Sequence, residues 1–211
     1  MADCKAWEEV IRRDAGEKPK LLAELIPPGG MFYDIGANVG AMTDMVLELN
    51  PDIYCTLFEP VKEYYEYITE KYKNNPRITT VHCAIVDQDR EIEMSVDGHN
   101  FGWNTITEIN DYGQKEKVSG RSLSSIVLER KFKLPDVIKI DVEQSEYLVI
   151  EGAKGLLATH HPKGIMVEIG IHNGHKLWDK EEEMIKYMFN IGYGEYDYKS
   201  FNNTYDVIFR K

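Results

Sequence analysis

The pattern of hydrophobic and polar positions along this chain is of two kinds, one typical of strands and one typical of helices. Short apolar runs typical of strands are separated by longer segments whose apolar residues recur every three or four positions, as on one face of a helix. Helices are expected at 4–14, 19–26, 39–49, 60–74, 121–130, 145–158 and 179–191. Strands are expected at 31–35, 53–59, 78–86, 91–96, 135–143, 164–170, 194–200 and 204–210. Such alternation predicts a doubly wound α/β fold, a mostly parallel sheet with helices on both faces.

Two segments depart from this alternation. Residues 97–120 are rich in Gly, Asn and aromatic residues without a clear period, and we expect an insertion made of a loop with a short strand. The last two strand-like runs are joined by Asn202 and Asn203, which predicts a terminal antiparallel hairpin. We expect one domain over 1–211, with 1–28 as an N-terminal helical segment and 97–120 as a lid.

Composition and charge narrow the class of partner. With 43% hydrophobic residues the chain can bury an ordinary core, and 25 basic against 36 acidic residues give a net charge of -11. This charge disfavours nucleic acid and anionic membranes as partners.

We find no signal peptide and no apolar run of about 18 residues, so we expect no membrane span. Three cysteines without metal spacing indicate a reducing compartment, and we predict a cytoplasmic protein. The sequence leaves open a homo-oligomer, or a domain of a larger protein.

Acidic residues end four of the predicted strands. They are Asp34, Glu59, Asp141 with Glu143, and Glu168. In a doubly wound sheet the carboxyl ends of the strands share one edge, and ligands bind there at the topological switch point. One such acid alone is most often a helix cap or a solvated turn, whereas four in register favour a ligand site.

The loop after the first strand, DIGANVG at 34–40, indicates which ligand. A dinucleotide fingerprint needs Gly where Asn38 stands, so that the backbone can approach a pyrophosphate. Asp34, two residues before Gly36, disfavours a phosphate and favours an ammonium or a sulfonium cation. Glu59, at the end of the next strand, is placed to accept both hydroxyls of an adenosine ribose. A nucleoside with a cationic tail, S-adenosylmethionine, fits these residues better than a dinucleotide.

With these motifs the chain resembles the FkbM-type S-adenosylmethionine-dependent methyltransferases of the class I fold. The matching stretches between about residues 30 and 170 are DIGANVG, FEP at 58–60, RSLSSIV, IKIDVEQSE at 138–146, EGAKGLL and MVEIG at 166–170. The resemblance implies a seven-stranded sheet with a reversed last strand. One departure is Gln144, where the family usually has Gly, which permits backbone angles that Gln resists.

The resemblance also implies roles for the cofactor residues. Asp34, Gly36, Asn38 and Gly40 would hold the methionine end of S-adenosylmethionine and Glu59 the ribose. The backbone near Cys83 and Ala84 would lie by the adenine. Cys83 alone is equally well explained as a small buried core residue.

Methyl transfer requires alignment of the acceptor and removal of its proton. An unactivated hydroxyl has a pKa of about 16, which a divalent ion lowers. Asp141 and Glu168 suit Mg²⁺, a hard ion that prefers oxygen ligands, and they suit direct binding of sugar hydroxyls equally well. A protein base is the other route to a deprotonated hydroxyl. His172, with an ordinary pKa near 6.5, is the candidate base, and His175 is a second candidate.

The acceptor is expected under residues 97–113 of the insertion. Side chains that combine flat apolar faces with hydrogen-bonding edges suit a sugar ring, although such aromatics also pin a long loop onto a sheet. The candidates are His99, Phe101, Trp103, Asn104 and Tyr112, with Glu143 beside them. We therefore predict an O-methyltransferase acting on a sugar or glycan hydroxyl, or on a small natural product. The alternatives are a nicotinamide-dependent oxidoreductase, and a non-catalytic cofactor-binding or assembly module suggested by Gln144.

Overall fold

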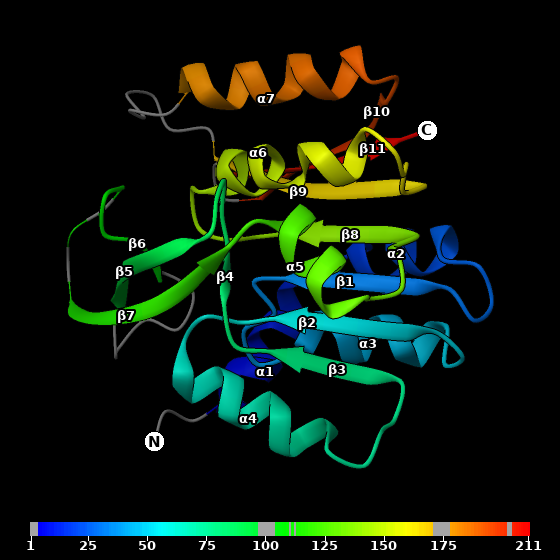
Figure 1. Ribbon diagram of the computed structural model, residues 1–211. Coiled ribbons are helices and arrows are strands. Elements are labelled where there is room, and N and C mark those ends of the chain that lie inside the picture. The colour runs from blue at the N-terminus through cyan, green and yellow to red at the C-terminus, as the bar shows by residue number, and fades with distance from the viewer. Residues whose placement is uncertain (1–3, 97–103, 110, 112, 171–177, 202–203) are drawn as a thin grey trace.

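A seven-stranded sheet forms the centre of the computed structural model, which describes residues 4–96, 104–109, 111, 113–170, 178–201 and 204–211 (Figure 1). Its strand order is β10-β11-β9-β8-β1-β2-β3. The strands are β1 Met31–Ile35, β2 Tyr54–Phe58, β3 Ile78–Val81, β8 Val137–Ile140, β9 Gly164–Gly170, β10 Gly194–Phe201 and β11 Thr204–Arg210. All neighbours are parallel except β11, which is antiparallel to both β9 and β10. This confirms the predicted fold class, the terminal hairpin and the reversed last strand.

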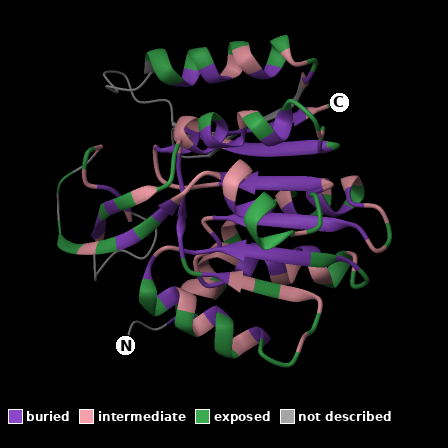
Figure 2. Ribbon diagram, in the orientation of Figure 1, coloured by how far each residue is buried: buried purple, intermediate pink, exposed green. Residues whose placement is uncertain are grey.

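Helices cover both faces of this sheet. They are α1 Cys4–Asp14, α2 Lys18–Leu25, α3 Ala41–Leu49, α4 Lys62–Tyr72, α5 Leu123–Arg130, α6 Glu146–Leu157 and α7 Trp178–Asn190. One core cluster joins buried residues of α2, α3 and α4, such as Leu22, Val46 and Ile68, to one face. A second cluster joins α5, α6 and α7 to the other. The central strands are therefore buried along most of their length (Figure 2), which explains the near-continuous apolar run of β8.

A second, four-stranded sheet lies beyond the carboxyl ends of the main strands (Figure 1). Its order is β4-β7-β5-β6, with β4 Ala84–Ile85, β5 Arg90–Val96, β6 Thr105–Ile106 and β7 Gln114–Arg121. The single strand predicted at 78–86 is wrong. The chain turns after Val81, where the Cys83 amide donates to the Val81 carbonyl at 3.2 Å, and β4 leaves the main sheet to pair with β7.

The loop predicted at 97–120 is wrong in part. Residues 114–121 form the long strand β7, which pairs antiparallel with the whole of β5. In β7 only Val118 and Gly120 are buried. A strand with one buried face is recognised by apolar residues at every second position, and β7 has too few buried positions to show that pattern in its sequence. None of the helices in the described part of the chain combines the length and the apolar character that a membrane crossing needs.

Candidate active site

A cavity of about 970 Å³, including its mouth, opens at the carboxyl ends of β1, β2 and β8. Its lining includes residues that the sequence singled out, namely Gly36, Asn38, Glu59, Cys83, Ala84, Asn104, Asp141 and Glu143. The sheet edge where the four acidic strand ends were expected is thus the edge where the cavity lies.

The loop after β1 is fixed by close contact with its neighbours. Gly36 has a φ of +76°, and a Cβ at this position would lie 1.9 Å from the carbonyl oxygen of Asp141. The amides of Gly36 and Ala37 donate to the Phe58 carbonyl at 3.0 and 3.1 Å. Gly40, with a φ of +77°, is the residue before the first turn of α3. The loop is therefore held between the ends of β2 and β8, with Gly36, Ala37 and Asn38 lining the cavity.

Asp34 does not take the position expected from the sequence. Its side chain is fully buried, does not line the cavity, accepts a hydrogen bond from the Thr43 hydroxyl at 2.7 Å and lies 3.2 Å from Lys139 Nζ. Asp34 therefore does not make the contact with a ligand in the cavity that was expected from the sequence. Its carboxylate instead holds Lys139 beneath the loop.

Lys139 is the residue that the sequence reasoning missed. Its ammonium donates to the Gly36 carbonyl at 2.8 Å and lies 3.4 Å from Asp141 Oδ2. Burial alone would lower the pKa of Lys139, but the negative charges of Asp141 and Asp34 outweigh burial and raise it above its ordinary value. Lys139 thus stays charged and connects two strand ends to the loop. The sequence did contain a signal for this role, because Lys139 is the single charged residue inside an apolar strand that ends in acidic residues.

Glu59 lies at the end of β2 and is only 4% exposed. Its two carboxylate oxygens accept hydrogen bonds from the amides of Asn38 at 2.7 Å and Val61 at 2.8 Å. Burial raises the pKa of Glu59 to about 7, and these two bonds offset part of the rise. Nearby, burial raises the pKa of the Cys83 thiol to about 12, so this side chain is a neutral part of the cavity wall as well as a core residue.

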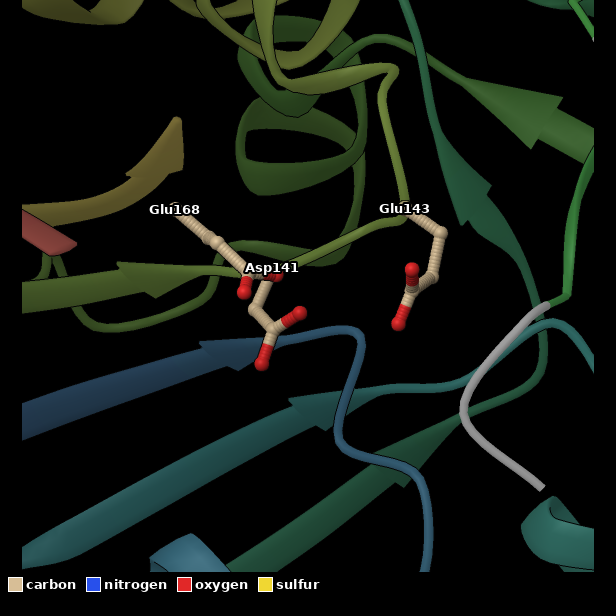
Figure 3. A group of neighbouring side chains, drawn as sticks. All are labelled: Asp141, Glu143 and Glu168. Atoms are coloured by element: carbon tan, nitrogen blue, oxygen red, sulfur yellow. The ribbon is translucent and has the colours of Figure 1, made fainter. Parts of the chain in front are cut away.

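Three acids gather at the ends of β8 and β9. Oxygen atoms of Asp141, Glu143 and Glu168 all lie within 4.8 Å of one another. Figure 3 shows Asp141 beside Glu168, with Glu143 reaching toward them from the loop after β8. β1 lies between β8 and β2 in the sheet, so this cluster and Glu59 flank the Gly36 loop.

The charges of this acidic cluster are not equal. Burial raises the pKa of Asp141, but Lys139 and a hydrogen bond with Glu168 outweigh burial and hold it below the ordinary value. The charge on Asp141, followed by burial, raises the pKa of Glu168 to about 10. Burial, followed by Asp141, raises the pKa of Glu143 to about 9. At neutral pH the cluster therefore holds an ionised Asp141 hydrogen-bonded to a protonated Glu168, beside a protonated Glu143.

The loop that carries Glu143 adopts a costly backbone. Glu143 and Gln144 have φ values of +54° and +76°, in the left-handed region that favours glycine. Each such residue costs roughly 1–2 kcal/mol. Gln144 thus adopts the angle that its side chain resists, and the Thr105 hydroxyl of the small sheet donates to the Glu143 carbonyl at 2.7 Å. The loop therefore keeps the left-handed backbone that a glycine would favour, although Gln144 stands where the family usually has Gly.

The remaining candidates divide between the cavity wall and the residues that are not described. Asn104 lines the cavity and hydrogen-bonds Tyr64, whose pKa burial raises to about 12. Outside the described residues lie His99, Phe101, Trp103, Tyr112, His172 and His175. Their predicted roles stay predictions.

Comparisons with known proteins agree on one kind of fold. A family model described as a methyltransferase FkbM domain matches residues 34–199. A search of curated protein sequences gave no match. Among solved structures, a precorrin-6y C5,15-methyltransferase from Geobacter metallireducens is 11% identical with a TM-score of 0.53, over 92% of this chain and 87% of that one.

Two further solved structures are similar. Aeropyrum pernix fibrillarin, solved with bound S-adenosyl-L-methionine, is 12% identical with a TM-score of 0.55, over 92% of this chain and 73% of that one. An O-methyltransferase family protein from Burkholderia thailandensis is 9% identical with a TM-score of 0.52, over 99% of this chain and 59% of that one. At these identities the likeness shows the fold alone.

Proposed function

Because the chain belongs to the FkbM family of S-adenosylmethionine-dependent methyltransferases with the class I fold, we propose that it methylates a hydroxyl group of a sugar, a glycan or a small natural product. The observation that carries this proposal is the pairing of two unlike acidic sites around one cavity. Glu59 is a buried single carboxylate on one side of the Gly36 loop, and the proton-holding cluster of Asp141, Glu143 and Glu168 lies on the other.

The residues on the Glu59 side fit the nucleoside half of the cofactor. A ribose offers two hydroxyl donors, and Glu59 lines the cavity with a carboxylate that already orders the loop backbone. Cys83, Ala84 and Ile85 supply an apolar wall suited to a purine ring. When bound, S-adenosylmethionine supplies an electrophilic methyl group on a positively charged sulfur. The ionised Asp141, on the opposite side of the Gly36 loop, makes that end of the cavity favourable for the charge.

The residues of the acidic cluster fit the removal of a proton from a hydroxyl. Asp141 is ionised and would accept a hydrogen bond from the acceptor, which orients the oxygen for in-line attack. Glu143 lines the cavity, and its raised pKa makes its ionised form the stronger base. Only the ionised form of Glu143, a minor species at neutral pH, would accept the proton that the hydroxyl loses when its oxygen takes the methyl group, and S-adenosylhomocysteine would be released. Glu168 is not part of the cavity lining, so we assign it a positioning role through its hydrogen bond with Asp141.

A divalent ion is the second way in which this cluster could activate a hydroxyl. Mg²⁺ prefers oxygen ligands and usually binds one or two carboxylates together with water, and these three acids offer oxygen atoms within 4.8 Å of one another. The charged Lys139, 3.4 Å from Asp141, already neutralises part of this site and competes with such an ion. We therefore expect turnover to survive EDTA, and recovery of lost activity on adding Mg²⁺ would favour the metal route instead.

The proposal is tested by transfer from methyl-labelled S-adenosylmethionine to a panel of monosaccharides, oligosaccharides, hydroxylated natural products and RNA. Mass spectrometry should find label on a sugar or natural-product oxygen. Glu143→Gln should reduce turnover about 100-fold or more and abolish the increase in rate with pH that ionisation of a base near pH 9 produces. Glu151→Gln, an exposed acid on α6, is the matched control. Label found only on RNA or on nitrogen would overturn the proposed acceptor class.

Cofactor binding separates the rival functions. Calorimetry should show that S-adenosylhomocysteine binds the wild-type chain and binds Glu59→Gln more weakly, with the exposed Glu66→Gln unchanged. A nicotinamide cofactor that binds in place of S-adenosylhomocysteine would support an oxidoreductase. Tight S-adenosylhomocysteine binding without transfer to any member of the panel would support a non-catalytic module.

A further inference from the structure

The N-terminal helix α1 contributes to the cavity although it lies outside the matched family region. The family match begins at residue 34, whereas Trp7 and Ile11 of α1 line the cavity beside Glu59 and the Gly36 loop. Both side chains pack against the cluster that contains Ala41 at the start of α3 and Val61 before α4. α1 therefore forms part of the wall on the Glu59 side of the site.

This helix is only lightly packed against the rest of the molecule. Cys4 is the one buried residue among the eleven of α1, while Trp7 and Ile11 are half-buried. Half-buried apolar side chains that line a cavity lose their remaining contact with water when a ligand fills it. A ligand in this cavity would thus add to the packing that holds α1 in place.

A group of charged side chains attaches α1 to α3 and α4. Glu8 lies 3.0 Å from Lys71, Lys71 lies 2.5 Å from Asp44, and Arg12 lies 3.5 Å from Asp44. Lys71 also donates to the carbonyl of Val39, within the loop after β1, at 3.2 Å. These side chains are between 17% and 32% exposed, so salt screens their attraction in part. The same lysine thus contacts both α1 and the predicted cofactor loop.

We propose that α1 is a movable wall of the cofactor site, in which Trp7 and Ile11 close over the adenosine of S-adenosylmethionine and the Glu8–Lys71–Asp44–Arg12 pairs hold the helix closed. The flat face of an indole ring suits packing against a purine. The inference rests on the proposed cofactor, and it assigns part of the affinity for that cofactor to a helix that the family match does not include.

Calorimetry with S-adenosylhomocysteine tests the role of Trp7. Trp7→Ala should weaken binding at least tenfold, and Trp7→Phe, which keeps a flat apolar ring, should recover most of the affinity. Arg13→Ala is the matched control on the same helix, because Arg13 is exposed and pairs only with its neighbour Asp14 among the contacts of the described residues. Circular dichroism confirms that each variant is folded. Equal affinity of the wild-type chain and Trp7→Ala would overturn the inference.

Limited trypsinolysis tests the closing movement on the wild-type chain. S-adenosylhomocysteine should slow cleavage after Arg12 and Arg13 severalfold and leave cleavage after the exposed Lys131, at the end of α5, unchanged. Equal rates at Arg12 and Arg13 with and without S-adenosylhomocysteine would overturn the movable wall.

Salt dependence tests the charged attachment. Lys71→Met should weaken S-adenosylhomocysteine binding severalfold and remove most of its decrease with rising salt, whereas Glu24→Gln on the surface of α2 should change neither. Unchanged salt dependence in Lys71→Met would contradict the role of the ion pairs. If the wild-type chain itself fails to bind S-adenosylhomocysteine, the proposed function fails, and this outcome is distinct from failure of the α1 inference.

Discussion

Two residues, Gly36 and Lys139, determine how closely the strand ends approach one another. Gly36 lets the loop after β1 pass the Asp141 carbonyl, where any side chain would collide. Lys139 holds the Gly36 carbonyl on one side and the carboxylates of Asp34 and Asp141 on the other. Removing a partner from such a buried group leaves uncompensated charge, which typically costs about 3–5 kcal/mol. The shape of the cofactor loop therefore depends on these two side-chain identities.

Gly36→Ala should lower the free energy of unfolding by at least about 3 kcal/mol, because it combines a left-handed backbone with a collision against backbone atoms. Gly29→Ala is the matched control, since Gly29 has a φ of +67° but nothing within 4 Å of an added Cβ. This control should lose only about 1 kcal/mol. Urea denaturation measures both values, and similar losses in the two variants would contradict the close approach at Gly36.

The small sheet supports the loop that carries Glu143. β6 pairs with β5, and Thr105 of β6 reaches across to the Glu143 carbonyl at 2.7 Å. The two left-handed residues of this loop keep their angles only if surrounding contacts hold them. The strands that follow Val81 thus act as a rigid support for the acidic cluster.

Thr105→Val should therefore loosen the Glu143 loop without affecting the Glu59 side. Hydrogen exchange of the amides at 142–146 should accelerate, and turnover with an identified acceptor should decrease roughly tenfold or more, because small misplacements of reacting groups are costly. Affinity for S-adenosylhomocysteine should stay the same. Thr107→Val, which removes a hydroxyl 3.2 Å from Ser95 instead, is the control. Identical behaviour of the two variants would show that the Thr105 bond does not hold the loop.

At the scale of the whole molecule, burial and the charge of Asp141 keep several carboxyls protonated in the fold. Burial raises the pKa of Glu146 to about 8, and Glu143 and Glu168 reach about 9 and 10. In the unfolded chain such groups lose their protons near pH 4.3. Between these limits the native state binds more protons than the unfolded state. Stability is therefore full below about pH 4.3 for these groups and is lost as pH rises toward 8–10.

Thermal melting should accordingly show a Tm that decreases by several degrees between pH 6 and pH 9. Glu168→Gln removes one titrating group but keeps a hydrogen-bond donor for Asp141, so its Tm should decrease less over the same range. The exposed Glu151→Gln should follow the wild-type curve. A Tm that increases from pH 6 to pH 9 would contradict the raised pKa values.

The sequence by itself determined the order of the elements and the edge at which the site lies. Hydrophobic period is a local property, so helices and strands such as α6 and β9 were predicted within one or two residues of their observed ends. Acids at strand ends indicated the cavity edge because parallel strands place those ends together. The family motifs were likewise readable as short contiguous stretches.

Only the tertiary structure decided which acids line the cavity and which are buried beneath it. Asp34 is paired in register with Lys139 across β1 and β8, residues more than a hundred positions apart, and this pairing turns a predicted ligand contact into an internal ion pair. The small sheet is also a result of tertiary pairing. Its strand β7 has little apolar pattern of its own and is a strand because it pairs with β5. Strand register is a non-local property, and burial and pKa follow from it, so no local pattern could supply them.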